Sequence, residues 1–187
     1  MRLLALPILA CLVWSAAAAA ADQTACPAGL VSGKSLDDEF GAGTQANTRC
    51  LKHRTKVKVV IQINNLYQNG PNGQPYFLKQ IKQAILDYEV THGMRRGVDY
   101  EIAAIVFGDG APLALNNDAA ERHSLENPFQ PMVKELMDMG VEFYFCQNTG
   151  RRLKVQHKHV LPGFKYVTAG LTAMVDFQKD GYFPLTW

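Results

Sequence analysis

Short apolar segments alternate with segments of helical periodicity along most of this chain, and that alternation constrains the fold more than any other feature. The apolar segments are "KVKVVIQINN", "VDYEIAAIVFGDG", "VEFYFC", "VTAG" and "YFPLTW". Their enrichment in β-branched and aromatic residues over short lengths predicts strands. Strands that alternate with helices are typical of a parallel sheet with helices on its faces, so we predict the α/β class.

The segments between the strands carry the apolar spacing of amphipathic helices. In "YFLKQIKQAILDYEVTHGM" the residues Phe77, Ile81 and Ile85 recur about one helical turn apart, which places them on one face. "FQPMVKELMDMG" predicts a second helix, with Asn127 as its N-cap and Pro128 at its first position. A third helix is expected in "LTAMVDFQKDG", ahead of the last strand.

The start of the chain has the pattern of a secretory signal peptide. A short positive start precedes the apolar run "LLALPILACLVW", and a poly-alanine tract with a polar exit follows. We expect cleavage near Ala20 or Ala21, which removes residues 1–21. The mature protein would then be periplasmic or secreted, with no stable membrane insertion. The alternatives are an uncleaved anchor and a lipoprotein modified at Cys11.

The remaining chain divides into an arm and one domain. Residues 22–55 mix turn formers with isolated apolar residues, so we expect an irregular N-terminal arm wrapped on the domain. Residues 56–187 hold the predicted strands and helices, and their number suits a single α/β domain. A formal net charge of +2 gives no indication of binding to nucleic acid.

The cysteine count singles out one thiol. Cys11 leaves with the expected signal peptide, and three cysteines remain for an oxidising compartment. An odd count implies either a free thiol or an intermolecular bridge. Cys26 and Cys50 both lie in the arm, where a bridge would fasten a segment with little core of its own. We therefore predict that these two pair and that Cys146 is left alone.

Three polar segments follow the carboxyl ends of the first three strands: "NNLYQNG", "GDGAP" and "CQNTG". In parallel sheets, ligands bind at the carboxyl ends of the strands, near the point where strand order reverses. We therefore expect these segments to meet at one site. Asn64 could bond a bound anion or merely end its strand, and Asp109 could bond a substrate or merely stabilise a tight turn. Gly108 would let the backbone pass close to the site.

Cys146 ends the third strand, at a position that suits either chemistry or packing. The thiolate is the nucleophilic form of cysteine. Backbone N–H groups of a short helix, or of the turn that holds Asn148 and Gly150, would favour that anion. Arg151 and Arg152 can add positive charge, and the same groups would hold a persulfide or a small sulfur oxyanion. The alternative is a buried cysteine that acts as a small hydrophobic residue.

A weaker pattern is "VQHKHV", in which His157 and His159 lie two residues apart. On a strand they would share a face, and with Cys146 they could ligate a metal ion. The alternative is an exposed basic loop. This spacing is too common to predict a site, so we expect no metal ion. We expect no organic cofactor either.

The order of these blocks resembles the DsrE/DsrF-like family over roughly residues 56–187. The resemblance rests on "VVIQINN", "YEIAAIVFGDGAPLAL", "LMDMGVEFYFCQNTGRR" and "LPGFKYVTAGLTAMVDFQKDGYFPL". It implies a three-layer α/β/α fold with a mainly parallel five-stranded sheet and assembly as a homo- or hetero-oligomer. It also implies that the cysteine after the third strand, here Cys146, carries sulfane sulfur as a persulfide between partner molecules.

Two functional hypotheses follow from the sequence. The first is an exported sulfur carrier that uses Cys146 and exchanges sulfur with donor and acceptor proteins or with small sulfane-sulfur compounds. The second is an oligomeric envelope protein that binds or organises partners and keeps an inert, buried cysteine. The export signal distinguishes this chain from the relay systems of the family, which work in the cytoplasm.

Overall fold

A computed structural model describes residues 30–66, 73, 75–117, 119 and 127–186. The expected signal peptide and Cys26 lie outside these residues, so the structure does not bear on either. Within the described residues, no helix is long and apolar enough to cross a membrane.

The centre of the molecule is a five-stranded sheet in the order β4-β3-β2-β1-β5. The strands are β1 (Val57–Ile63), β2 (Tyr100–Val106), β3 (Glu142–Cys146), β4 (Lys165–Val167) and β5 (Phe183–Leu185). Each neighbouring pair is parallel. The α/β class and the five-stranded parallel sheet are confirmed.

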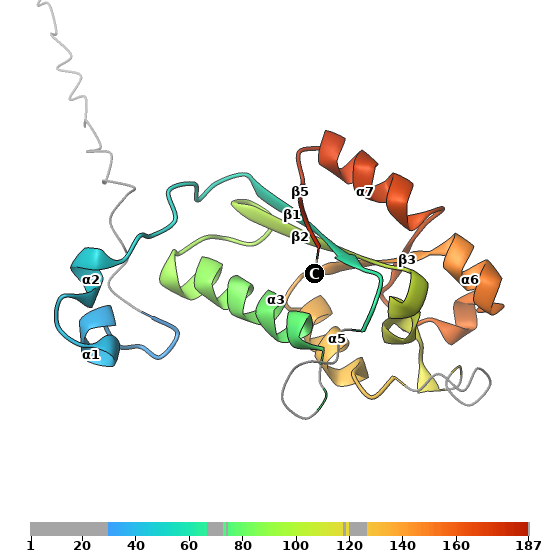
Figure 1. Cartoon of the computed structure of the whole chain (residues 1–187), viewed down its shortest axis with the longest axis horizontal. Helices are drawn as coiled ribbons and strands as arrows, with labels where there is room; N and C mark the ends of the chain where they lie inside the picture. Colours follow the sequence, from blue (N-terminus) through green and yellow to red (C-terminus); the bar gives the residue numbers. More distant parts are fainter. Residues whose placement is uncertain (1–29, 67–72, 74, 118, 120–126, 187) are drawn as a thin grey trace, which may run out of the picture.

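Helices cover both faces of this sheet, which gives three layers (Figure 1). Helical elements that the structure describes in the domain include α3 (Tyr76–Leu86), η2 (Asp87–Thr91), η3 (Gly108–Ala114), α5 (Gln130–Asp138), α6 (Gln147–Leu153), η4 (His157–His159) and α7 (Gly170–Lys179). Helices α3 and α5 lie on one face, α7 lies on the other, and α6 follows directly from the carboxyl end of β3.

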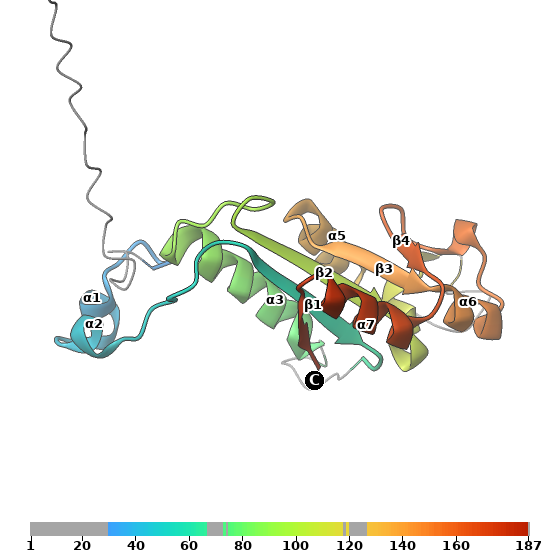
Figure 2. The ribbon, with the colours of Figure 1, turned by 90° about the horizontal axis from the view of Figure 1, so that it is seen from above.

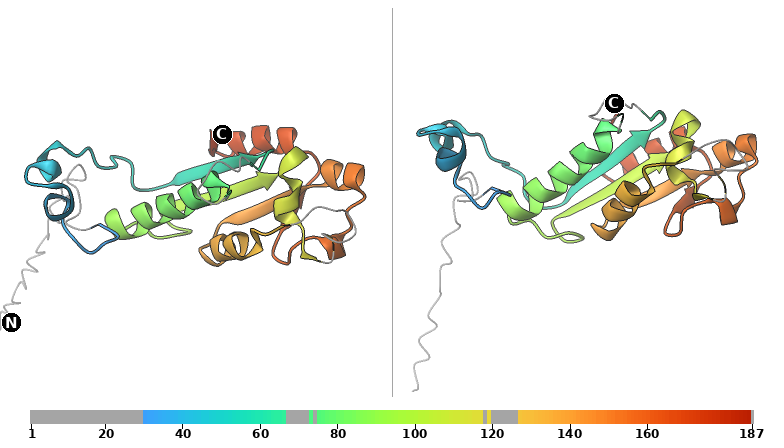
Figure 3. Two further views of the ribbon diagram at one scale, coloured as in Figure 1. Left: turned by 60° about the horizontal axis from the view of Figure 1, so that its bottom comes forward. Right: turned by 90° about the horizontal axis from the view of Figure 1, so that it is seen from below.

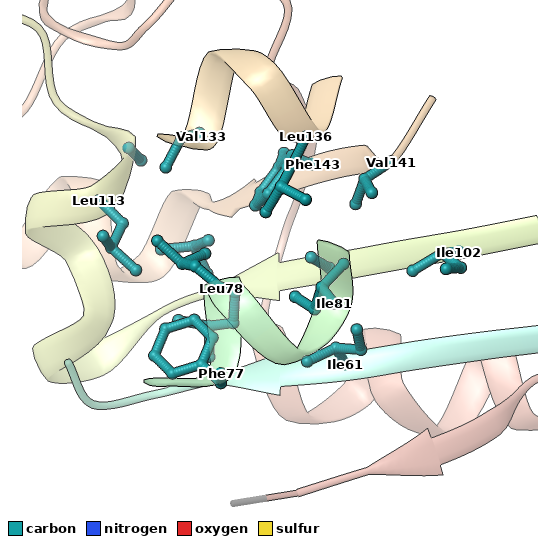
Figure 4. Packing of buried hydrophobic residues seen from close by; sticks show 14 of the residues in the cluster. Ile61, Phe77, Leu78, Ile81, Ile102, Leu113, Val133, Leu136, Val141 and Phe143 are labelled. Carbon is teal, nitrogen blue, oxygen red and sulfur yellow. The ribbon is translucent and has the colours of Figure 1, made fainter. Parts of the chain in front are cut away.

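The main core lies between the sheet and helices α3 and α5 (Figure 4). Alternate residues of β1 and β3, such as Ile61 and Phe143, point into it because successive side chains of a strand face opposite sides. Phe77 and Ile81 of α3 meet them at the predicted helical spacing, and both are at most 2% exposed. The periodicity of the sequence therefore predicted this layer correctly.

The core under α7 is much smaller. Its buried members are Val60, Ala103, Ile105 and Met174. Phe177 of α7 adds an edge-on contact with the ring of Tyr144, at 5.2 Å between centroids. Two other α7 side chains, Leu171 and Val175, remain 67% and 55% exposed. Helix α7 thus covers the face of the sheet onto which Tyr144 projects.

The arm contains two short helices that the sequence analysis did not predict, α1 (Leu36–Phe40) and α2 (Thr44–Asn47). Ser35 caps α1 by accepting the Asp38 N–H, as N-cap serines do. Neither helix has a buried residue, and both project from the end of the domain (Figures 2 and 3). The arm meets the domain at Leu51, whose N–H donates to His92 Nε2 at 3.2 Å.

Three local expectations need correction. The N-cap of α5 is Phe129 instead of Asn127, because the Asn127 amide donates to the carbonyls of Leu113 and Leu115 and so fixes the preceding loop. Strand β4 ends at Val167, where the sequence analysis expected it to begin. A ligand site was expected near the point where the strand order reverses. That point is at β1, which lies between β2 and β5 and is two strands away from β3.

Candidate functional site

The segments that follow β1, β2 and β3 meet at the carboxyl edge of the sheet, as expected from the sequence. The Asp109 N–H donates to the Asn64 carbonyl at 3.0 Å, which joins the first two segments. The Gly108 N–H donates to Thr149 Oγ1 at 3.0 Å, which joins the second segment to α6. Gly108 has a φ of +57°, a left-handed conformation that favours glycine.

Close backbone approach explains a second glycine in this region. A Cβ atom on Gly110 would lie 2.5 Å from the Ile63 carbonyl oxygen, well inside contact distance. The turn after β2 therefore packs directly on the end of β1. Hydrogen bonds and packing of this kind give the edge a fixed backbone frame.

Cys146 is the last residue of β3 and lies directly before α6. It pairs in register with Val167 of β4, and it shares a strand face with Tyr144, which packs under α7. Its side chain therefore belongs to the α7 side of the sheet. Cys146 is a free cysteine, and it is 3% exposed.

Burial and hydrogen bonding act in opposite directions on the Cys146 thiol. Burial raises its pKa, because a thiolate loses the solvation of water. Hydrogen bonds from the Thr149 N–H and hydroxyl, and from the Gly170 and Asn148 N–H groups, lower the pKa. The hydrogen bonds outweigh burial, so the pKa lies below its usual value. The surroundings of the sulfur favour a thiolate.

Thr149 is the site residue that the sequence analysis missed. Its side chain is buried, its hydroxyl oxygen accepts the Gly108 N–H, and its hydroxyl is also one of the groups that lower the pKa of Cys146. The contact could have been suggested by the place of Cys146 directly before a helix, since the side chain of an N-cap residue faces the second and third helix residues. The identity of Gly170 as a donor depends on the path of the chain from β4 into α7, which no local pattern reveals.

The two arginines expected beside the sulfur are not among the groups that lower its pKa. Arg151 lines a cavity on α6 and donates from Nη1 to Asn148 Oδ1 at 3.0 Å. Arg152 is exposed on the same helix. Gly150 is buried, and a Cβ there would lie 3.1 Å from the Phe145 ring, so it serves close packing of α6 on β3.

The remaining predicted residues lie at the edge without reaching the sulfur through a described contact. Asn64 contributes its backbone carbonyl, which accepts the Asp109 N–H. The Asp109 side chain is exposed at the start of η3. Both residues therefore order the backbone frame that carries Gly108.

The pair of histidines does not converge with the cysteine. His157 Nδ1 lies 2.5 Å from the Tyr166 hydroxyl, and the Gln156 N–H donates to His159 Nδ1 at 3.2 Å. No group of three or more His, Cys, Asp or Glu side chains is placed to hold a metal ion among the residues that the structure describes.

The sequence matches the DsrE/DsrF-like family over residues 58–187. The chain belongs to this family. The matched region takes in the sheet except for Val57, the helices that cover it and Cys146, while the arm lies outside it. No protein with curated annotation matches the sequence.

Two solved structures resemble this DsrE/DsrF-like chain. One is MTH1491, a protein of unknown function from Methanobacterium thermoautotrophicum, with a TM-score of 0.55 and 18% identity over 70% of this chain and 99% of that one. The other is the YchN protein from E. coli, with a TM-score of 0.46 and 17% identity over 70% of this chain and 99% of that one. At such identity the resemblance to MTH1491 shows a shared fold and nothing more.

Cys50 of the arm is disulfide-bonded. Its expected partner, Cys26, lies outside the described residues. The pairing of these two cysteines therefore stays a prediction, while the separation of Cys146 as a free thiol is confirmed.

Proposed function

We propose that this DsrE/DsrF-like protein carries sulfane sulfur as a persulfide on Cys146. The supporting observation is the balance of effects on the thiol: donor groups of Thr149, Gly170 and Asn148 hold its pKa below the usual value, although burial raises it. Donors of this kind favour an anion on Cys146, either the thiolate or the persulfide that replaces it.

The proposed reaction is an exchange of one sulfur atom between thiols. The Cys146 thiolate attacks the outer sulfur of a donor persulfide, forms a new S–S bond and displaces the donor thiolate. An acceptor thiolate then attacks the outer sulfur on Cys146 and releases the Cys146 thiolate. One S–S bond forms and one breaks in each step, so no oxidant, reductant or organic cofactor is required.

Access to the sulfur requires movement of the segment that covers it. The β2–β3 register, continued past Val106 and Phe145, brings Phe107 beside Cys146, and Gly170 packs on the Phe107 ring. Because the core under α7 is small, we expect the α7 layer to open more easily than the layer of α3 and α5. We infer that sulfur donors and acceptors reach Cys146 when the β4–α7 connection moves away from Phe107.

Intact-mass measurement tests the carrier directly. After incubation with polysulfide, wild-type protein should gain the mass of one sulfur atom, and a reducing thiol should remove it. The Cys146→Ser variant serves as the matched control, because it keeps a small polar side chain at the same position. Equal sulfur uptake by Cys146→Ser and by wild type would contradict the proposal.

The burial of Cys146 favours a second candidate, an oligomeric binding or scaffold protein of the envelope whose thiol is inert. The exposed side chains of Leu171 and Val175 on α7 would suit contact with another subunit or partner. A thiol-reactive probe separates the two functions. Modification of the native protein at neutral pH supports the carrier, whereas modification only after denaturation supports the scaffold.

We further propose that the protein works outside the cytoplasm, as a homo-oligomer that exchanges sulfur with partner proteins or small sulfane-sulfur compounds. The support is the sequence pattern of residues 1–21 and the membership of the family. N-terminal sequencing of protein from a fractionated cell envelope would find a start near residue 22. Light scattering on the same sample would give the oligomer mass.

A further inference from the structure

A cavity of the described residues lies on the opposite side of β3 from the Cys146 thiol. It encloses about 520 Å³ and is lined by Phe145, Gln147, Gly150, Arg151, Val155, Gln156, His157, Val160 and Tyr166. Phe145 belongs to the core under α3 and α5, whereas Cys146 projects toward α7. The cavity is therefore separate from the site proposed to carry sulfur. Its volume is typical of small-molecule binding sites.

One face of α6 forms a wall of this cavity. Gln147, Gly150 and Arg151 share that face because they are three and four residues apart on the helix. Asn148 and Thr149, whose N–H groups lower the pKa of Cys146, do not line the cavity. A side chain at position 150 would meet Phe145, so glycine keeps the helix close to the floor of the cavity.

The polar groups of the lining favour an anion. Arg151 supplies a fixed positive charge, and its guanidinium is oriented by the bond from Nη1 to Asn148 Oδ1 at 3.0 Å. The imidazole of His157 and the hydroxyl of Tyr166 stand on the other side, held together at 2.5 Å between Nδ1 and Oη. No aspartate or glutamate is among the lining residues. The lining therefore has no carboxylate to attract a cation, whereas a carboxylate or sulfonate would find a guanidinium and several other donors.

The apolar groups of the lining favour a flat or aliphatic body on that anion. Phe145, Val155 and Val160 come from β3, from the loop after α6 and from the segment after η4. Two smaller cavities differ in chemistry. One, of about 220 Å³, is lined by Glu101 and Glu142 as well as Arg96, and another, of about 200 Å³, has no charged residue in its lining.

We propose that this cavity binds a small organic anion, with its acidic group on Arg151 and its apolar body against Phe145, Val155 and Val160. The site is independent of sulfur transfer, because the thiol lies on the other face of the sheet. A charge-assisted contact with a guanidinium is among the stronger hydrogen bonds in proteins, so Arg151 should dominate the affinity.

Calorimetry and amide NMR with a pair of matched probes test the proposal. The probes are 2-naphthoate and its neutral isostere 2-naphthamide. Wild-type protein should bind 2-naphthoate saturably, with shifts of the Val155, Val160 and Tyr166 amides. The neutral probe should bind at least about tenfold more weakly, a difference of about 1.4 kcal/mol.

Matched variants locate the contact. Arg151→Gln should weaken 2-naphthoate at least about tenfold, by the same conversion. Arg152→Gln, a change at the adjacent exposed arginine on α6, should bind like wild type. Failure of wild type to bind saturably, equal affinity for the two probes, equal affinity of Arg151→Gln and wild type, or shifts confined to other residues would each overturn the proposal. The probe comparison needs only wild-type protein, so it holds even if a variant folds poorly.

Discussion

Replacement of Thr149 by valine tests the origin of the perturbed thiol most selectively. The substitution keeps the shape and volume of the side chain and removes only the hydroxyl. That hydroxyl accepts the Gly108 N–H at 3.0 Å and bonds the Cys146 sulfur. Two effects should follow, one on the pKa of Cys146 and one on the free energy of unfolding.

The size of both effects follows from these contacts. A hydrogen bond to a charged group contributes about 1.5–3 kcal/mol, and one pKa unit corresponds to about 1.4 kcal/mol. The N–H donors of Thr149, Gly170 and Asn148 remain in the variant. We therefore expect the pKa of Cys146 to rise by about one unit, which corresponds to the lower end of the energy range for such a hydrogen bond. Loss of the acceptor for the Gly108 N–H should lower the free energy of unfolding by about 1–3 kcal/mol.

Carbon-13 NMR of labelled cysteine gives the pKa without requiring access to the buried thiol. The Cβ shift of Cys146 should be followed against pH in wild type, Thr149→Val and Thr149→Ser. The serine variant keeps the hydroxyl and should titrate close to wild type. Thr172→Val is the control for the chemical change, since Thr172 lies on the exposed side of α7 and its hydroxyl donates only to the Ala169 carbonyl among the described contacts.

The reasoning is refuted if Thr149→Val titrates at the same pH as wild type. It is also refuted if Thr149→Ser and Thr149→Val shift the titration equally, because the hydroxyl would then not be the group responsible. Denaturant unfolding of the same samples gives the free-energy change. A stable Thr149→Val protein would show that the Gly108 N–H does not depend on this acceptor.

Three further predictions concern stability. Gly170→Ala places a Cβ 2.6 Å from the Phe107 ring, so the free energy of unfolding measured with denaturant should fall by about 1–3 kcal/mol. A Gly170→Ala variant that is as stable as wild type would contradict this packing. Leu136→Ala should lower the free energy of unfolding by about 2–5 kcal/mol, because Leu136 is 1% exposed. Leu171→Ala should lower it by less than about 0.5 kcal/mol, because Leu171 is 67% exposed. Equal losses of unfolding free energy would contradict the assigned core. Because the folded pKa of Cys146 is lowered, the unfolded state binds the extra proton. The free energy of unfolding of the wild type should therefore rise relative to that of Cys146→Ser as pH rises from the folded pKa of Cys146 to its unfolded value of about 8.5. Denaturant unfolding at several pH values measures this difference. A difference in unfolding free energy that does not change with pH would contradict the lowered pKa.

The sequence predicted the central sheet well because its signals are local and strong. The run around Ile61 is rich in β-branched residues, and the spacing of Phe77 and Ile81 fits one helix face, so both elements formed where expected. The start of α5 was predicted two residues or more too early, because Asn127 bonds the carbonyls of Leu113 and Leu115 across the loop. Such contacts between distant segments leave no mark in a local pattern.

The candidate site was predicted in position and only partly in composition. Sequence placed Cys146 at the end of a strand and left it unpaired, and both features are confirmed. Arginine side chains were the evident source of positive charge, yet the donors to the sulfur are the Thr149 side chain and backbone N–H groups. Backbone donors are present at every residue except proline, so only the folded path of the chain shows which of them converge.

Loading and discharge of sulfur at Cys146 is the measurement that tests the central claim most directly. The protein without its signal peptide would be incubated with a persulfide donor that carries an isotopic label on its outer sulfur. The sample would be divided, and one half would be mixed with an acceptor thiol. Peptides of both halves would then be mapped. The account predicts label on the peptide that contains Cys146, and its quantitative passage to the acceptor. Label that is absent from this peptide, or that stays there when the acceptor is present, would contradict it.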